Sequence, residues 1–143
     1  SYMAKIELFE NPIFGAAIRR CHAFPVKRGE SDRGAIKAAV TVLKEGRVLG
    51  LFPEGTRSKT GELQKAEAGV ALIAAMTGAP IVPVAILNTH RIFSNGGLIP
   101  QLRIIYGEPI TFDGDRKSKE TLDAFSADIM AHIARMKDEL SKK

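Results

Sequence analysis

A run of about twenty uncharged residues, from position 68 to position 87, most constrains how this chain can fold. Its sequence, AGVALIAAMTGAPIVPVAIL, has the length of a helix that spans a bilayer. Gly78 and Pro80 interrupt it in the middle, however, and Pro83 follows. Because glycine ends helices and proline cannot continue one, the run predicts a buried helix that ends at Gly78 and a strand from Ile81 to Leu87.

Helix and strand patterns alternate along the rest of the chain. Asn11 and Ser31 are suited to cap helices, and Gly46 is suited to end one. Apolar residues from Leu122 to Leu140 recur every three or four positions, which places them on one helical stripe. The expected helices are Asn11–Arg20, Ser31–Glu45, Glu67–Thr77 and the C-terminal helix that carries this stripe. The expected strands are Tyr2–Leu8, Ala23–Val26, Arg47–Phe52, Ile81–Leu87 and Leu102–Tyr106.

This alternation predicts an α/β fold, with a largely parallel sheet flanked by helices. The length of 143 residues suits a single domain with one core, so we expect one domain over residues 1–143. In such sheets, ligands bind beyond the carboxyl ends of the strands. Sites are therefore sought where the predicted strands end.

The charge balance favours an anionic partner. The chain carries 21 Lys and Arg against 16 Asp and Glu, a net charge of +5. Aromatic residues are only 6% and tryptophan is absent, which argues against base-stacking platforms, so nucleic-acid binding rests on the charge alone. The single cysteine, Cys21, cannot form an internal disulfide, which fits a reducing compartment.

The stretch FPEGTRS, from Phe52 to Ser58, follows the predicted strand Arg47–Phe52 directly. Arg57 offers a planar fork of donors that matches a phosphate, Thr56 adds a hydroxyl, and Gly55 lets the backbone approach a ligand closely. Glu54 can orient the arginine or accept a hydrogen bond from a hydroxyl group. These groups suit a ligand with both phosphate and hydroxyl groups. The alternative is a tight turn locked by a Glu54–Arg57 ion pair.

A phosphate-loop interpretation of the same stretch fails. Gly50 and Gly55 have the Walker separation, but Thr56 and Arg57 stand where lysine and a hydroxyl should follow. Pro53 also removes a backbone N–H from such a cradle.

A second basic cluster follows the predicted strand Ala23–Val26. It contains Lys27, Arg28 and, nearby, Arg33. Arg28 lies at a strand's carboxyl end, so it can converge with Arg57 on one anion. The alternative is a solvated basic loop, which is the preferred interpretation for Lys27 and Arg33.

Four segments make the chain resemble the glycerolipid acyltransferase family, most of all its bacterial 1-acyl-sn-glycerol-3-phosphate acyltransferases. Phe52–Ser58 matches the family's third motif fully. Phe24–Arg28 resembles the second motif. Ile81–Ile86 resembles the fourth motif, whose proline corresponds to Pro83. The block from Tyr2 to Gly15 resembles the region between the first two motifs.

The resemblance implies transfer of an acyl group from an acyl thioester, acyl-CoA or acyl carrier protein, to lysophosphatidic acid, giving phosphatidic acid. It implies substrate-binding roles for Arg28, Glu54, Gly55, Thr56 and Arg57. No metal or redox cofactor is expected for this reaction. Alternatives are another lyso-lipid or glycerol 3-phosphate as the acceptor, or a non-catalytic module that binds anionic lipid.

Acyl transfer to a hydroxyl needs a base, which the family supplies as His, four residues, Asp. None of the three histidines fits, because the fifth residue after His22 is Lys27, after His90 is Asn95 and after His132 is Lys137. We therefore expect an N-terminally truncated fragment that is itself inactive, with no catalytic residue identifiable in this chain. His90 is a weak substitute, and a loop histidine is the preferred interpretation.

Three further features are weaker candidates. Lys65 and Pro83 fall where the resemblance implies family positions, and Lys65 can approach the phosphate. Ile13, Phe14 and Ile18 adjoin Arg19-Arg20, an arrangement that suits an anionic bilayer surface; a core-facing helix with exposed arginines is equally compatible. We expect the protein at the cytoplasmic face of the cell membrane, peripheral or anchored by segments not present here.

Overall fold

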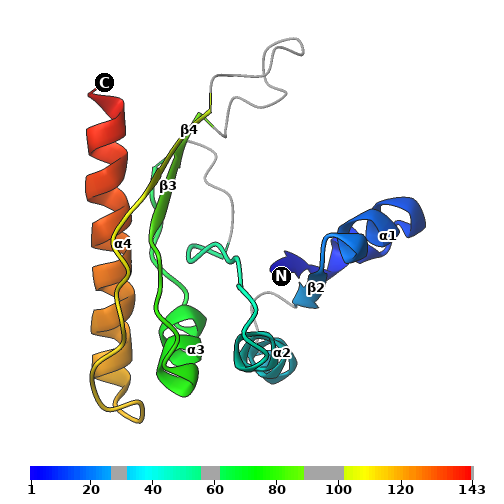
Figure 1. Cartoon of the computed structure of the whole chain (residues 1–143), viewed down its shortest axis with the longest axis horizontal. Coiled ribbons are helices and arrows are strands. Elements are labelled where there is room, and N and C mark those ends of the chain that lie inside the picture. Colours follow the sequence, from blue (N-terminus) through cyan, green and yellow to red (C-terminus); the bar gives the residue numbers. More distant parts are fainter. Residues whose placement is uncertain (27–31, 56–61, 89–101, 143) are drawn as a thin grey trace. The chain divides into compact units, whose positions relative to one another are not determined.

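The computed structural model describes residues 1–26, 32–55, 62–88 and 102–142 (Figure 1). The chain divides into two compact units, Ser1–Phe52 and Pro53–Lys143, and each is described by itself. The expectation of one domain over residues 1–143, truncated at its N-terminus, stays a prediction.

The first unit is built on a parallel pair of strands. β1 (Tyr2–Lys5) pairs with β2 (Ala23–Val26), with Tyr2 opposite Ala23 and Lys5 opposite Val26. The 3₁₀ helix η1 (Ile6–Phe9) and the helix α1 (Pro12–Arg20) connect them. Both strands were predicted, although the expected strand Tyr2–Leu8 ends early, where η1 begins.

The start of α1 follows the sequence prediction closely. The side-chain oxygen of Asn11 accepts hydrogen bonds from the backbone N–H groups of Ile13 and Phe14, at 3.1 and 3.0 Å. Pro12 occupies the first helical turn, where its missing N–H costs nothing. Gly15 is buried against η1, since a Cβ there would lie 2.8 Å from the carbonyl oxygen of Phe9. The helix therefore docks on η1 through its glycine.

The second helix, α2 (Arg33–Lys44), is capped by a different residue from the one predicted. Asp32 is the N-cap, and its Oδ1 accepts a hydrogen bond from the N–H of Ala35 at 2.9 Å. The prediction of Ser31 was wrong by one position, because adjacent Ser and Asp have equal capping chemistry and only the backbone geometry selects between them. Gly46, with φ +72°, ends the turn after α2 as expected.

The prediction of a buried strand over Arg47–Phe52 was wrong. Only Gly50 in this stretch forms a bridge, a parallel one to Tyr2. The side chains of Val48 and Phe52 are 82% and 73% exposed. A strand needs a continuous ladder of backbone partners, and β1 offers this stretch a single bridge, so apolar composition alone does not make it a strand.

The second unit contains α3 (Gly69–Thr77), β3 (Val84–Leu87), β4 (Arg103–Tyr106) and α4 (Lys119–Ser141). Gly78, with φ +67°, ends α3 where the sequence predicted. The helix begins two residues later than expected, and its buried residues are Val70, Ala71, Ile73 and Ala74. The uncharged run is thus a short helix followed by a strand. Among the described residues, no helix has both the length and the apolar character needed to cross a membrane.

β3 and β4 pair antiparallel, with Val84 opposite Tyr106 and Leu87 opposite Arg103. The sequence predicted no helix between these two strands, and strands joined without a crossover helix pair antiparallel. Among the described strands, the pair in the first unit is therefore parallel and the pair in the second unit is antiparallel. Pro83 has no N–H to donate, which explains why the regular ladder begins only at Val84.

The long helix α4 forms one side of the second unit's core and runs along β3 and β4 (Figure 1). Ser118 caps it, accepting a hydrogen bond from the N–H of Thr121 at 3.2 Å. Ile129, Ile133 and Met136 of the predicted stripe are buried. This confirms the stripe as a sheet-covering face.

The capping assignment gives a stability test. We expect Asp32→Ala to lower the free energy of unfolding by about 1 kcal/mol, because it removes the acceptor for the Ala35 N–H. Asp32→Asn is the matched control, since it keeps a capping oxygen and should cost only a few tenths of that. Urea denaturation followed by circular dichroism measures both. Equal losses for the two variants would contradict the assignment.

Candidate functional site

Two backbone N–H groups hold Pro53 and Glu54, which belong to the described part of the third motif, Phe52–Gly55, in place. The Glu54 Oε2 accepts a hydrogen bond from the N–H of Gln64 at 2.8 Å. The Pro53 carbonyl accepts one from the N–H of Glu67, also at 2.8 Å. The backbone of Gln64 and Glu67, ten or more positions further along the chain, thus contacts the motif. The sequence analysis did not single out Gln64 or Glu67, because backbone donors carry no signature in side-chain chemistry.

Gly55 has a conformation that explains why glycine stands there. Its φ is +64°, a left-handed conformation that side chains rarely adopt. A Cβ at this position would also lie 2.8 Å from the Cγ of Glu67. The predicted role of Gly55, close approach of the backbone to a ligand, stays a prediction. What the structure adds is a second reason for glycine, the contact with Glu67.

Three of the five predicted substrate-binding residues, Arg28, Thr56 and Arg57, lie outside the described residues, as does His90. Convergence of Arg28 and Arg57 on one phosphate therefore stays a prediction, and so does a Glu54–Arg57 ion pair. Among the described residues, the backbone N–H of Gln64 donates a hydrogen bond to the Glu54 carboxylate. A carboxylate has about four acceptor positions, so the Gln64 N–H leaves room for Glu54 to accept a hydrogen bond from a substrate hydroxyl.

The two weaker candidates differ in their surroundings. Lys65 is exposed and lines a shallow hollow of about 330 Å³ beside the N-terminal part of α4. That hollow holds two lysines and two carboxylates, so it carries no strong net charge; its lining is Lys65, Ala66, Glu67, Ala68, Lys119 and Asp123. Pro83 is fully buried, and its carbonyl accepts a hydrogen bond from Gly107 N–H at 2.9 Å. In this structure Pro83 is a core residue.

Lys5 is a cation that the sequence analysis missed. It ends β1 and lies opposite Val26, the last residue of β2. Its Nζ forms an ion pair with Glu7 at 2.8 Å, and both side chains are partly exposed. The sequence analysis extended this strand to Leu8, so Lys5 lay in the middle of the expected strand, and only the early start of η1 places it at a carboxyl end.

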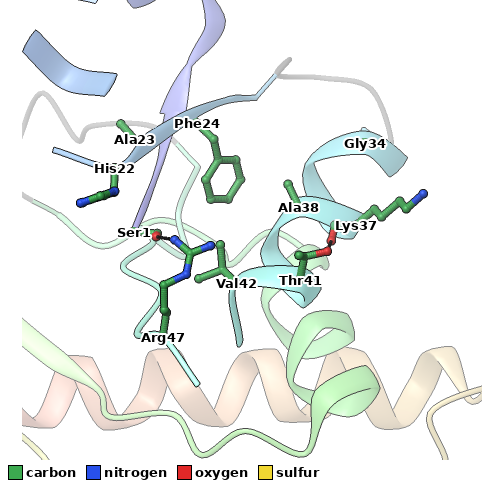
Figure 2. A pocket seen from close by; sticks show the side chains of 10 residues that line it. All are labelled: Ser1, His22, Ala23, Phe24, Gly34, Lys37, Ala38, Thr41, Val42 and Arg47. Carbon is green, nitrogen blue, oxygen red and sulfur yellow. Dashed lines mark hydrogen bonds between the residues drawn. The ribbon is translucent and has the colours of Figure 1, made fainter. Parts of the chain in front are cut away.

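A larger hollow, of about 530 Å³, lies in the first unit between β2 and α2. Figure 2 shows Phe24 facing Ala38 and Val42 of α2, and the Arg47 guanidinium reaching Ser1, whose Oγ accepts its hydrogen bond at 2.9 Å. Neither Glu54 nor Gly55, the two described members of the predicted binding set, lines this hollow.

His22 and His132 are the two histidines among the described residues. His22 adopts φ +58° at the turn into β2, and its carbonyl accepts a hydrogen bond from Tyr2 N–H. His132 lies on α4, with its Nδ1 2.9 Å from the Asp128 carbonyl. Neither histidine has the spacing of a His-Asp pair. Among the described residues, no group of His, Cys, Asp and Glu is arranged to hold a metal ion.

A protein-family model and the sequences of known proteins were compared with this chain, and both point to acyltransferases. The acyltransferase family model matches residues 1–87. The 1-acyl-sn-glycerol-3-phosphate acyltransferase of Bacillus subtilis (strain 168) is 35% identical over 99% of this chain and 70% of that protein. The enzyme of the same name from Streptococcus pneumoniae (strain ATCC BAA-255 / R6) is 35% identical over 96% of this chain and 51% of its own length.

A solved structure gives the same result for the fold. The crystal structure of the 1-acyl-sn-glycerophosphate acyltransferase PlsC from Thermotoga maritima aligns with the whole chain at a TM-score of 0.72 and 26% identity, covering 57% of that protein. This confirms the predicted α/β fold. The chain belongs to the acyltransferase family. The more particular resemblance, to the bacterial 1-acyl-sn-glycerol-3-phosphate acyltransferases, is confirmed by the relatives that bear this name.

The close approach of Gly55 to Glu67 can be tested by combining substitutions at the two positions. Gly55→Ala should lower stability by roughly 1–3 kcal/mol, through the positive φ and the clash with Glu67. Gly46→Ala is the matched control, because Gly46 has φ +72° but nothing within 4 Å of a Cβ. In a Glu67→Ala background, Gly55→Ala should cost no more than Gly46→Ala. A loss that is unchanged in that background, measured by urea denaturation, would refute the contact.

Proposed function

We propose that the protein transfers an acyl group from an acyl thioester to 1-acyl-sn-glycerol 3-phosphate, which gives phosphatidic acid. The observation that carries this proposal is the 35% identity, over 99% of the chain, to a Bacillus subtilis protein named for that reaction. The chain spans 70% of that relative and 51% of the Streptococcus pneumoniae one, so the proposal concerns the activity of the whole protein.

The proposed reaction is a single acyl transfer. The free hydroxyl oxygen of the glycerol attacks the thioester carbonyl carbon, a C–O bond forms, and the C–S bond breaks. The hydroxyl proton passes to a base, and the sulfur leaves as the thiol of coenzyme A or of a carrier protein. The reaction changes no oxidation state.

The residues of this chain would supply recognition of the glycerol phosphate. Arg28 and Arg57 would hold the phosphate through charge-assisted hydrogen bonds. Thr56 and Glu54 would bind and orient the glycerol. In support, Glu54 is anchored to the Gln64 backbone and yet keeps acceptor capacity, and Gly55 has the left-handed backbone that only glycine adopts readily.

The proton acceptor forms a separate part of the proposal. No histidine in the 143 residues is followed five positions later by aspartate. We therefore propose that the base lies in a part of the protein outside these residues. The proposed place of reaction is the cytoplasmic face of the cell membrane, since the acceptor is a membrane lipid. Attachment there would be peripheral or through segments outside these residues.

The phosphate assignment predicts a selective loss of activity. In the full-length protein, Arg57→Ala should lower kcat/KM for lysophosphatidic acid by about 10- to 100-fold, because a hydrogen bond to a charged group contributes about 1.5–3 kcal/mol. The loss should fall mainly on KM. Arg135→Ala, an exposed arginine on α4, removes the same charge and is the control. Unchanged kinetics of Arg57→Ala would refute the phosphate role.

The missing base predicts the behaviour of the 143-residue chain alone. It should turn over lysophosphatidic acid and acyl-CoA little or not at all, although it keeps the residues proposed to bind the phosphate. Product formation measured by mass spectrometry tests this, with the full-length protein as the positive control. Robust turnover, abolished by His90→Ala, would show instead that His90 is the base.

A further inference from the structure

The helix α2 presents charge of a single sign to the solvent. The whole helix is described, and its buried residues are Ala35, Ala39, Val40 and Val42. Its exposed residues are Arg33, Gly34, Lys37, Thr41 and Lys44. The exposed set therefore consists of three cations and two small residues, and α2 contains no acidic residue. Arg33, Lys37 and Lys44 form what we call the α2 cationic face.

The three cations lie along one line of the helix. At about 100° per residue, Lys37 and Lys44 lie about 40° and about 20° around the helix axis from Arg33. At a rise of about 1.5 Å per residue, they lie about 6 Å and about 16 Å further along that axis. None of the three forms an ion pair with another described residue. Figure 2 shows the Lys37 side chain extended away from Phe24, so its ammonium group is accessible to a partner.

Helix stability does not account for Arg33. This residue occupies the first position of α2, directly after the N-cap Asp32. The helix macrodipole places positive charge at that end, so an acidic side chain there stabilises a helix and a cation does not. The first turn of α2 contains no acidic residue. A cation at this position therefore calls for a reason outside the helix.

The net charge of the chain is concentrated in the unit that contains α2. The first unit has nine Lys and Arg against five Asp and Glu, so it carries +4 of the net charge of +5. The exposed residues of α4 in the second unit mix both signs, as in Lys119, Glu120, Asp123 and Arg135. Mixed signs are usual for a helix face that meets only water. The single sign on α2 therefore predicts an anionic partner.

We propose that the α2 cationic face docks an acidic protein surface, and that this partner is the carrier protein that brings the acyl thioester. Carboxylates of the partner would meet Arg33, Lys37 and Lys44 and would steer the encounter. Such pairs stay near water and are screened by salt, which suits a donor protein that must leave after each transfer. The inference rests on the proposed function and gives the acyl donor a docking surface on this chain.

The composition of the face favours a protein over the other anionic partners. A helix that lies on a bilayer needs large apolar side chains that enter the lipid, and apart from its cations α2 exposes only Gly34 and Thr41. Coenzyme A carries its phosphates close together at one end of a small molecule. The row of cations instead extends about 16 Å along a rigid helix, a length that matches a second protein surface.

The first measurement is binding, with the full-length protein and no acceptor lipid. Isothermal titration uses acyl carrier protein that bears its pantetheine arm but no acyl group. We expect binding at low salt that weakens as the salt concentration rises, because the contact is made by screened charges. This readout needs no turnover, so it is independent of the proposed reaction. Turnover of palmitoyl-CoA without any binding of the carrier protein would overturn the docking proposal and leave the proposed function intact.

Charge reversal tests the face itself. The double variant Arg33→Glu with Lys37→Glu should raise the Kd for the carrier protein, and the KM for its palmitoyl thioester, about tenfold or more at low salt, because like charges then meet. The KM for palmitoyl-CoA and the kcat should change by less than about twofold, since neither depends on the carrier protein's surface. Glutamate is favourable in the first turn of a helix, so α2 should persist, which circular dichroism checks.

The matched control reverses one arginine and one lysine on α4. Arg135→Glu with Lys119→Glu makes the same change of charge and should bind the carrier protein like the unaltered protein. Three results would overturn the proposal. They are equal losses in the α2 and α4 variants, an equal rise in the KM for palmitoyl-CoA, or unchanged affinity for the carrier protein with lost binding to phosphatidylglycerol vesicles. The second result would assign the face to the phosphates of coenzyme A, and the third to a bilayer.

Discussion

The hydrogen bonds that fasten Pro53–Gly55 to the chain just ahead of α3 are the constraint on which the candidate site depends. A motif of turn residues has little secondary structure to hold it. Here the Gln64 N–H reaches the Glu54 carboxylate and the Glu67 N–H reaches the Pro53 carbonyl. Thr56 and Arg57 follow covalently from a point that is fixed in this way. Under the proposed function, the positioning of Arg57 at the phosphate depends on those two bonds.

The Glu54 carboxylate accepts a hydrogen bond from the backbone N–H of Gln64. The alternative interpretation of the motif, a tight turn with a Glu54–Arg57 ion pair, stays a prediction. A carboxylate has room for further donors, so this structural role is compatible with binding a substrate hydroxyl. Turn and binding site are therefore not competing explanations of FPEGTRS.

The sequence predicted local structure more closely than it predicted strand pairing. Caps, glycine stops and the α4 stripe depend on interactions within a few residues or on a single periodicity, and they were predicted to within one or two positions. The Arg47–Phe52 strand was not, and the antiparallel pairing of β3 with β4 was not foreseen, because strand pairing depends on partners far away in the chain. Asp32 and Ser31 show the limit of local reasoning, since neighbouring residues of equal chemistry differ only in backbone geometry.

The sequence by itself determined the family of this protein, its helices and the chemistry of its third motif, because these depend on residue types in a fixed order. The tertiary structure alone decided that Glu54 binds the Gln64 backbone, that Pro83 belongs to the core, and that Ile13 is exposed. Burial and hydrogen-bond partners come from segments brought together in space, and the order of residues along the chain does not specify them.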